Sequence, residues 1–281
     1  MAKLIDITGK ALSGEWGTDD ETGDGIPVLR TTNFTNEGVV NYNDVVTRII
    51  AKKNIEEKYL REGDIIIEKS GGSDKFPVGR VTYFDGEENT YLFNNFTGLL
   101  RVKNQDIWYS KYVFYSLFSN YKRGGTRAFE NKTTGLHNLK IDDYVSQYEV
   151  AEIDKNEQVL ICKKLDNLFS VIKLRKRELQ LLDNLIKVRF VEMFGNPASN
   201  PMGWEETTIG NECFYIKDGP HKSLPDIGKE NGGHPFISVR NIVNGHIDFS
   251  KPSFLQRIMT MQKKFWKYFI QNIRAIQILQ K

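Results

Sequence analysis

Short apolar runs separated by turn residues dominate residues 1–150, a pattern typical of strands joined by tight turns. Gly63-Asp64 introduces an apolar run at 65–67, the stretch 70–73 interrupts it, and 78–84 is expected to return as the neighbouring strand. The other predicted elements are strands at 91–93 and 98–102 and a helix at 110–121 with Ser110 as its cap. This part of the chain therefore predicts a mixed α/β domain.

The pattern changes between Gln158 and Phe194, where apolar residues recur at alternating spacings of four and three without a glycine or proline. Such spacing is the a/d seam of a coiled coil. Gly195-Asn196-Pro197 predicts the end of the helix. The seam consists of Ile161, Leu165, Leu168, Ile172, Arg175, Leu179, Leu182, Ile186, Arg189 and Met193.

A single helix cannot bury such a seam, so the pattern requires a second helix from this chain or from another. The expected pairing residues are Leu165, Leu168, Ile172, Leu179, Leu182 and Ile186. Arg175 and Arg189 interrupt the seam and are expected to set its register or to meet acidic residues of the partner.

A stretch near the start of the chain returns near its end. Residues 25–42 align with residues 233–249 so that a glycine, a proline and two asparagines fall in register, with Glu37 unmatched. A period of about two hundred residues indicates a duplicated domain, because repeat architectures use units of about 20–50 residues. A strand entering a glycine turn is expected at 216–219.

Residues 255–281 form an aberrant basic tail that does not continue the repeat. They fit an out-of-frame end of a truncated second domain, or a genuine terminal helix that dimerises or docks.

Composition and charge say little about the binding partner and more about the cellular compartment. The chain has 281 residues, 40% of them hydrophobic, and a net charge of +3. Residues 101–140 hold eight basic and two acidic side chains, which suits a polyanion or an ordinary solvated surface. The start of the chain lacks a secretory pattern and no run of 18 apolar residues occurs, so we expect a cytoplasmic protein.

The sequence lacks the cofactor-binding and catalytic motifs of common enzymes. There is no phosphate-binding GxxxxGK[ST] loop and no dinucleotide fingerprint. Asp64 and Glu68-Lys69 resemble part of a nuclease metal site, but Ser70 occupies the position of the usual lysine. The two cysteines, Cys162 and Cys213, belong to no zinc-binding or disulfide pattern. Catalysis by this chain alone is therefore not expected.

Several segments together resemble the specificity (S) subunits of type I restriction–modification systems. They are the strand 25–34, the turn 63–72, the stretch 132–139, the helix end 191–197 and the restart at 218–241. The resemblance implies an α+β protein: a target-recognition domain at 1–150, a long coiled-coil-type helical spacer at 151–197, an incomplete second recognition domain at 198–254 and the tail at 255–281. The chain resembles a half-size or truncated member.

The resemblance also implies a function. Such a subunit recognises double-stranded DNA and directs adenine methylation and restriction by methylase (M) and restriction (R) subunits. S-adenosylmethionine, ATP and Mg are expected on those partners and not on this chain. Pairing of the helix with another copy or another S subunit would replace the missing second spacer, and the polar outer face of the helix would bind the methylase.

The candidate DNA-binding residues are polar or basic side chains at strand ends, in glycine-rich turns and in the basic stretch. They are Arg30, Thr31, Asn33, Lys69, Ser70, Ser73, Lys75, Arg80, Asn94, Lys122, Arg123, Arg127, Lys132 and Thr133. Three features also fit structural roles: Gly71-Gly72 as a tight hairpin, Arg30 as an ion-pair partner and Asn33 as a turn cap.

Three other interpretations remain open at this stage. The chain fits a coiled-coil interaction module without DNA, which would lack salt-sensitive DNA binding. It fits a nuclease with an unrecognised site, which metal-dependent cleavage would reveal. It also fits a silent cassette whose first domain functions only after recombination.

Overall fold

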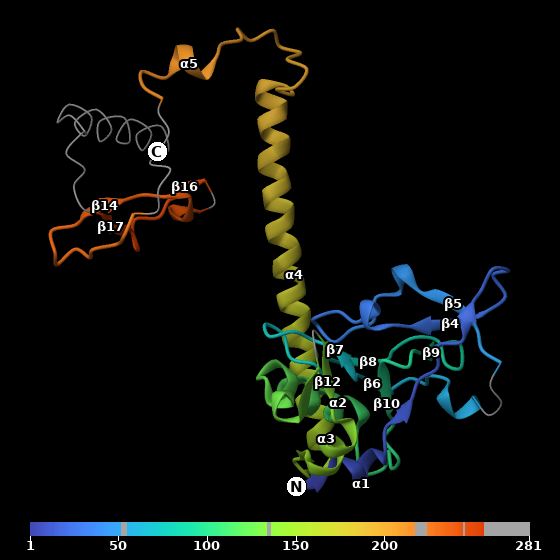
Figure 1. Cartoon of the computed structure of the whole chain (residues 1–281). Coiled ribbons are helices and arrows are strands. Elements are labelled where there is room, and N and C mark those ends of the chain that lie inside the picture. Colours follow the sequence, from blue (N-terminus) through green and yellow to red (C-terminus); the bar gives the residue numbers. More distant parts are fainter. Residues whose placement is uncertain (52–54, 134–135, 217–223, 244, 256–281) are drawn as a thin grey trace. The chain divides into compact units, whose positions relative to one another are not determined.

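The computed structural model describes residues 1–51, 55–133, 136–216, 224–243 and 245–255 (Figure 1). Its contacts divide the chain into unit 1, Met1–Phe194, and unit 2, Gly195–Lys281. The fold is mixed α and β with one long helix, as the sequence predicts. Each unit is described by itself.

Unit 1 contains two four-stranded sheets. The first has the order β2-β10-β6-β8 and is antiparallel throughout. The second has the order β3-β5-β4-β9, in which β4 and β9 are parallel. The strands are β2 (Leu12–Ser13), β3 (Thr18–Asp19), β4 (Ile26–Leu29), β5 (Val46–Ile49), β6 (Ile65–Glu68), β8 (Val81–Tyr83), β9 (Leu92–Phe93) and β10 (Thr97–Leu100).

Two smaller sheets complete the unit. β7 (Ser70–Gly71) joins the hairpin of β11 (Glu130–Thr133) and β12 (Leu136–Leu139) in the order β11-β12-β7. β1 (Ala2–Lys3) pairs with β13 (Glu149–Val150).

Strand β6 lies between the two hydrophobic cores of unit 1, which explains its unbroken apolar sequence. Ile65 and Ile67 pack in one core with α2 (Ser110–Lys122), and Ile66 packs in the other with Leu29 and Phe93. All three isoleucines are fully buried.

The predicted elements of residues 1–150 occur close to their expected places, with two corrections. The strand expected at 78–84 is shorter, because Gly79 has a φ of 97° and the Val78 amide donates to a side chain, that of Glu130. Ser110 is the first residue of α2 and makes no capping hydrogen bond; Tyr109 is the N-cap residue.

The remaining helices are short, apart from α4. They are α1 (Leu4–Thr8), α3 (Ile141–Gln147) and the 3-10 helices η1 (Thr31–Asn33), η2 (Tyr42–Asp44), η3 (Glu56–Lys58) and η4 (Gly125–Phe129). No helix of the described residues has the length and apolarity that crossing a membrane requires.

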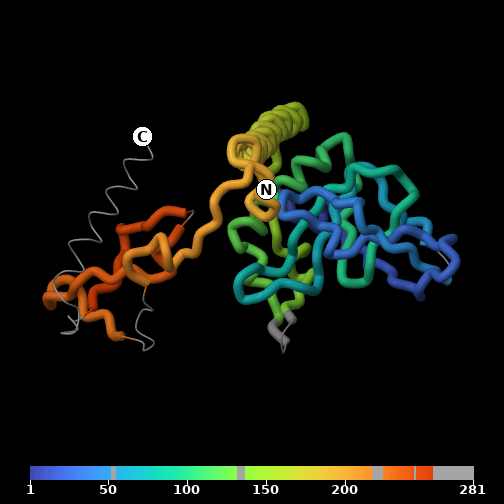
Figure 2. Tube along the Cα trace, turned by 90° about the horizontal axis from the view of Figure 1, so that it is seen from above, coloured from blue at the N-terminus to red at the C-terminus, as the bar shows by residue number. Residues whose placement is uncertain are grey.

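Helix α4 runs from Lys155 to Phe194, 40 residues, and begins three residues before the predicted start. At 1.5 Å per residue it is roughly 60 Å long. Gly195 follows with a φ of 77°, the left-handed conformation that ends many helices. The helix projects from the sheets of unit 1 at one side: seen from above, it is foreshortened and lies at the edge of the unit (Figures 1 and 2).

Unit 2 contains α5 (Ile209–Glu212), η5 (Val239–Asn241) and two strand pairs, β14 (His234–Phe236) with β17 (Ser253–Leu255) and β15 (Ile242–Val243) with β16 (His246–Ile247). Ile216 lies outside any strand, and the rest of the strand-and-turn expected there falls outside the described residues. Of the tail expected at 255–281, Leu255 belongs to β17, and the rest is likewise outside them.

The two repeated stretches share a backbone path. The side chain of Asn33 accepts from the Arg30 amide and donates to the carbonyls of Asn41 and Asp44. Asn241 accepts from the Ser238 amide in the same way, and its amide group donates to the carbonyls of Asp248 and Lys251. The strand pairing Ile26–Arg48 likewise corresponds to His234–Leu255. The repeat therefore extends beyond residue 249, where the sequence similarity ends.

Candidate nucleic-acid interface and helix-pairing surface

An exposed loop, residues 72–77, follows β7 and lies beside the β11–β12 hairpin in unit 1. The Ser73 amide donates to the Phe76 carbonyl at 2.7 Å, and the Phe76 amide donates to the Ser73 hydroxyl at 3.1 Å. Arg127 donates to the carbonyls of Asp74 and Lys75 at 3.1 and 3.3 Å. These hydrogen bonds fix the loop, so its exposed side chains have a defined place.

The β11–β12 hairpin holds both ends of this loop. One carboxylate oxygen of Glu130 accepts from the Val78 amide at 2.9 Å, and the other lies 3.1 Å from Nδ1 of the buried His137. β7 pairs with β12 through Gly71 and His137. Gly71 and Gly72 do make a tight turn, since a Cβ on Gly72 would lie 2.8 Å from the Val78 amide nitrogen.

The predicted DNA-binding residues fall into two groups. The exposed group gathers around the loop and the C-terminal end of α2: Ser73, Lys75, Lys122, Arg123 and Arg127. Lys132 and Thr133 belong to β11, whose hairpin adjoins the loop. The five exposed residues include the charge and have the accessibility that phosphate contacts require.

Lys69 and Ser70 are half-buried at the edge of this surface. The Lys69 ammonium donates to the Ser13 hydroxyl at 2.6 Å. Burial lowers its pKa, and the nearby Lys58 lowers it further. Ser70 lies in β7 opposite Asn138.

The second group is committed to the fold. Arg80 donates to the carbonyls of Thr31 and Phe34 at 2.8 and 2.9 Å and lies 3.4 Å from the Glu68 carboxylate. Burial raises the pKa of Glu68, an effect that Arg80 opposes. The Thr31 carbonyl is therefore occupied, and we assign Arg80 a structural role.

Asn33 and Asn94 are 1% and 4% exposed, too buried to reach a DNA groove. Asn33 uses its whole amide group as a turn cap, the structural alternative that its sequence position allowed. Arg30 forms an ion pair with Asp44 at 3.0 Å, its own structural alternative.

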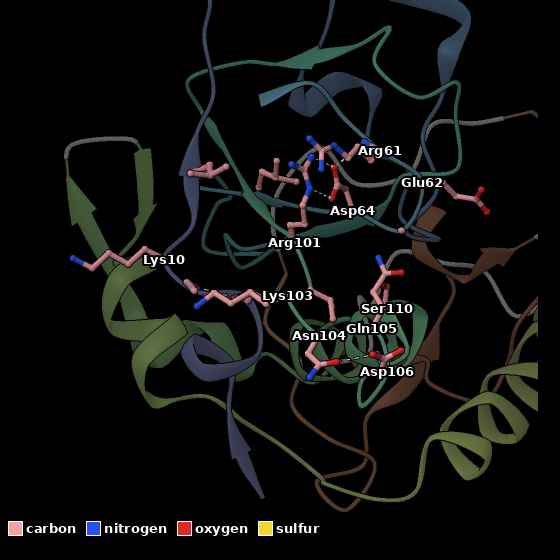
Figure 3. Close-up of a pocket in the computed structure, with 16 residues that line it drawn as sticks. Lys10, Arg61, Glu62, Asp64, Arg101, Lys103, Asn104, Gln105, Asp106 and Ser110 are labelled. Atoms are coloured by element: carbon pink, nitrogen blue, oxygen red, sulfur yellow. Dashed lines mark hydrogen bonds and ion pairs between the residues drawn. The ribbon is translucent and has the colours of Figure 1, made fainter. Parts of the chain in front are cut away.

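A surface hollow of about 770 Å³ lies elsewhere on unit 1, and no predicted DNA-binding residue lines it (Figure 3). Arg101 and Asp64 form a two-pronged ion pair in its wall at 2.8 and 2.6 Å. Lys10 and Lys103 project near it (Figure 3). The Asp64 carboxylate is thus paired with Arg101, and the Glu68 carboxylate lies beside Arg80. The described residues contain no group of three or more possible metal ligands.

The first turns of α4, here called the foot (155–169), are locked onto α2. The side chain of Gln158 is fully buried, accepts from the Tyr109 amide and donates to the carbonyls of Ile107 and Ile153. Phe169 stacks on Tyr115 with ring centroids 5.8 Å apart. The direction of the helix is therefore fixed by the domain.

The remainder of α4, here called the free length (170–194), is exposed at every residue. The predicted pairing residues Leu168, Ile172, Leu179, Leu182 and Ile186 are 42–69% exposed and form one stripe, while Leu165 lies half-buried at the foot. Arg175 and Arg189 interrupt the stripe and pair with Glu178 and Glu192 of the same helix, so no partner is needed to supply their acids.

A second apolar stripe runs beside the first, one residue earlier in each turn. It consists of Val171, Leu174, Leu181, Leu185 and Val188, which are spaced by three, seven, four and three residues, with Glu178 interrupting the stripe. The face expected to be polar is therefore partly apolar. The signal was present in the sequence, but the stronger a/d seam concealed it.

The comparison with protein families identifies the class of unit 1. The model of the type I restriction modification DNA specificity domain matches residues 2–184. The chain therefore belongs to this family.

Among solved structures, three similar chains come from the same kind of system. One, described for complex assembly and conformational transition of the type I R-M system, is 14% identical, with 81% of this chain and 58% of that chain covered and a TM-score of 0.49. The S subunit from M. genitalium is 19% identical, with 92% of this chain and 62% of that chain covered and a TM-score of 0.39. The HsdS subunit from Thermoanaerobacter tengcongensis is 13% identical, with 73% of this chain and 50% of that chain covered and a TM-score of 0.46.

This chain thus spans between 50% and 62% of the length of those three chains. None of the curated proteins matches it.

Proposed function

We propose that the chain is a DNA sequence-specificity subunit of a type I restriction–modification complex and that unit 1 reads one half of a split target. The observation that carries this proposal is the specificity-domain match over residues 2–184, which includes both the basic loop surface and the foot of α4. Its DNA would lie within the cytoplasm, where we expect the complex to act.

The exposed basic group supplies the electrostatic part of DNA binding. Lys75 lies in the fixed loop and Arg127 donates to it, while Lys122 and Arg123 lie at the C-terminal end of α2, so unit 1 presents several exposed cations to a phosphate backbone. Ser73 is exposed in the same loop and would make a shorter-range contact, whereas the half-buried Lys69 would have to leave the Ser13 hydroxyl to do so. Binding of this kind weakens steeply as salt rises.

The free length of α4 suits antiparallel pairing with a second copy. In an antiparallel pair, the register that places Leu179 opposite Leu182 of the second copy also places Leu168 opposite Met193, which overlaps the whole exposed stripe. Arg175 and Arg189 then oppose Ile186 and Ile172, so no two arginines face each other.

Charge on the flank of the stripe is compatible with that register. Lys176 and Asp183 both follow seam residues directly, and antiparallel pairing brings Lys176 of one copy near Asp183 of the other. The stripe is thus self-complementary in length, apolarity and charge. A two-fold dimer would carry two reading domains and match a two-fold symmetric split site.

The second stripe would bind a helix of the methylase subunit. It is offset from the dimer seam by about 100° around α4, so the methylase helix would bind beside the second copy. The chemistry belongs to those partner subunits, which we expect to hold S-adenosylmethionine, ATP and Mg, and the restriction subunit would join the same assembly.

Methylation mapping tests this function. The chain is expressed with cognate methylase subunits, and methylated adenines are located in the host genome. We expect a two-fold symmetric split sequence that is absent when the specificity chain is omitted. An unchanged methylation pattern, together with no salt-sensitive DNA binding by the purified chain, would contradict the proposal.

A further inference from the structure

The tip of the fixed loop carries a large apolar side chain where polar residues are usual. Phe76 is 56% exposed, although its amide and carbonyl are both hydrogen-bonded to Ser73. The backbone that carries Phe76 is held on both sides, because Arg127 donates to the Asp74 carbonyl and Glu130 accepts from the Val78 amide.

Two basic side chains lie at the loop around Phe76, and the acidic side chain of the loop, Asp74, lies 3.7 Å from His137. The Lys75 ammonium lies 5.3 Å from the centre of its ring, and Arg127 braces the preceding carbonyls. An aromatic ring among cations is poorly suited to a protein core but well suited to a nucleic acid, where the cations contact phosphates and the ring contacts bases.

We propose that Phe76 is an aromatic wedge that enters a DNA groove and stacks on, or partly separates, a base step. The inference rests on the proposed DNA-binding function and assigns a role to a residue that the polar and basic candidates do not include. Because a fixed loop loses little conformational freedom on binding, the ring would add affinity without ordering the backbone.

A wedge selects sequence through the ease of unstacking. Pyrimidine–purine steps unstack most readily, so Phe76 would favour such a step in the half-site without any hydrogen bond to a base edge. This would add specificity at a position that the basic side chains cannot read.

The test uses the full chain and the duplex identified by methylation mapping, with 2-aminopurine placed at successive positions. We expect wild-type protein to raise the fluorescence at one step, the sign of unstacking. F76A should abolish that signal and weaken binding about tenfold, whereas F76L should retain part of both. The salt dependence should stay the same in F76A and fall by about one unit of slope in K75A.

The matched control is F249A, since Phe249 is also 56% exposed and lies in unit 2. It should bind as wild type does, and F76A should unfold at the wild-type temperature because the side chain is exposed. Salt-sensitive binding by wild type with no loss in F76A and no fluorescence change would overturn the wedge while leaving the proposed function intact. Absence of DNA binding by wild type would overturn both.

Discussion

The foot and the free length of α4 are parts of one continuous helix with opposite surroundings. At the foot, Gln158 and Cys162 are buried against unit 1, and Asp166 receives hydrogen bonds from Lys111 and Tyr115. Along the free length, every residue is exposed, and Lys176 forms an ion pair with Glu37.

From this contrast we infer different roles for the foot and the free length. The foot uses polar groups in specific places, which fixes direction, whereas the free length uses apolar side chains in two stripes, which provides area for partners. Apolar exposure on this scale is typical of interaction surfaces. A helix fixed at one end and apolar at the other would transmit the position of a partner to the proposed DNA-binding surface.

The largest effect is expected from charge in the first stripe. The pair L179E/L182E places four carboxylates in the dimer seam and should raise the dimer dissociation constant by about a thousandfold or more. Analytical ultracentrifugation measures it.

The matched control is L181E/L185E in the second stripe. It should leave the dimer intact and instead abolish co-purification of the methylase subunit. Dissociation by both pairs to the same extent would contradict the assignment of separate partners to the two stripes.

The next effect concerns the foot. Q158L removes the partners of the Tyr109 amide and of the Ile107 and Ile153 carbonyls, and should destabilise unit 1 by about 3 kcal/mol. For a unit of this size, the unfolding temperature should fall by about 6–12 °C in a thermal scan. Q180L, the same change on the free length, should have almost no effect; equal losses would show that the foot is not specially fixed.

A smaller effect is expected from the flanking charges. K176E should weaken the dimer by about three- to tenfold, since two exposed ion pairs contribute up to about 1 kcal/mol each. Adding D183K should restore the affinity, because the charges are exchanged. A double variant weaker than K176E would contradict the antiparallel register. K176E also removes the contact with Glu37, so E37Q serves as the control and should leave the dimer unchanged.

The smallest effect is chemical and reports on the foot alone. Burial raises the pKa of Cys162 to about 11, so little of its thiol is ionised at pH 8. A thiolate-directed reagent should modify the exposed Cys213 first, and the rate at Cys162 should keep rising toward pH 11. Q158L should accelerate only Cys162. Equal rates at the two cysteines of wild type would contradict a packed foot.

The sequence predicted those features that depend on local pattern. The heptad spacing of α4, the glycine that ends it and the strand at Ile65–Ile67 are set by residues near one another, so periodicity reveals them. The repeat was visible through its glycine, proline and asparagines. Its extension to Leu255 was not, because β5 and β17 preserve backbone pairing without preserving side chains.

The candidate site depends on tertiary contacts, which the local sequence pattern does not reveal. Arg80 and Asn94 look like DNA-reading residues in sequence, but tertiary contacts bury or occupy them. Gln158 looks like an ordinary helix residue, and only its contacts with distant carbonyls reveal that it locks α4. Phe76 was overlooked for a related reason: its exposure depends on the fixed loop and cannot be read from its hydrophobicity.

The central claim is that the free length of α4 pairs antiparallel with itself, and a cross-link tests it most directly. L168C/M193C is introduced together with C213S, and the protein is mildly oxidised. We predict a covalent dimer from L168C/M193C and none from L168C alone, because two copies of residue 168 would lie about 37 Å apart along the rod. Efficient cross-linking through L168C alone would show parallel pairing, and a monomer in every variant would show that the free length does not pair with itself; either result would contradict the account.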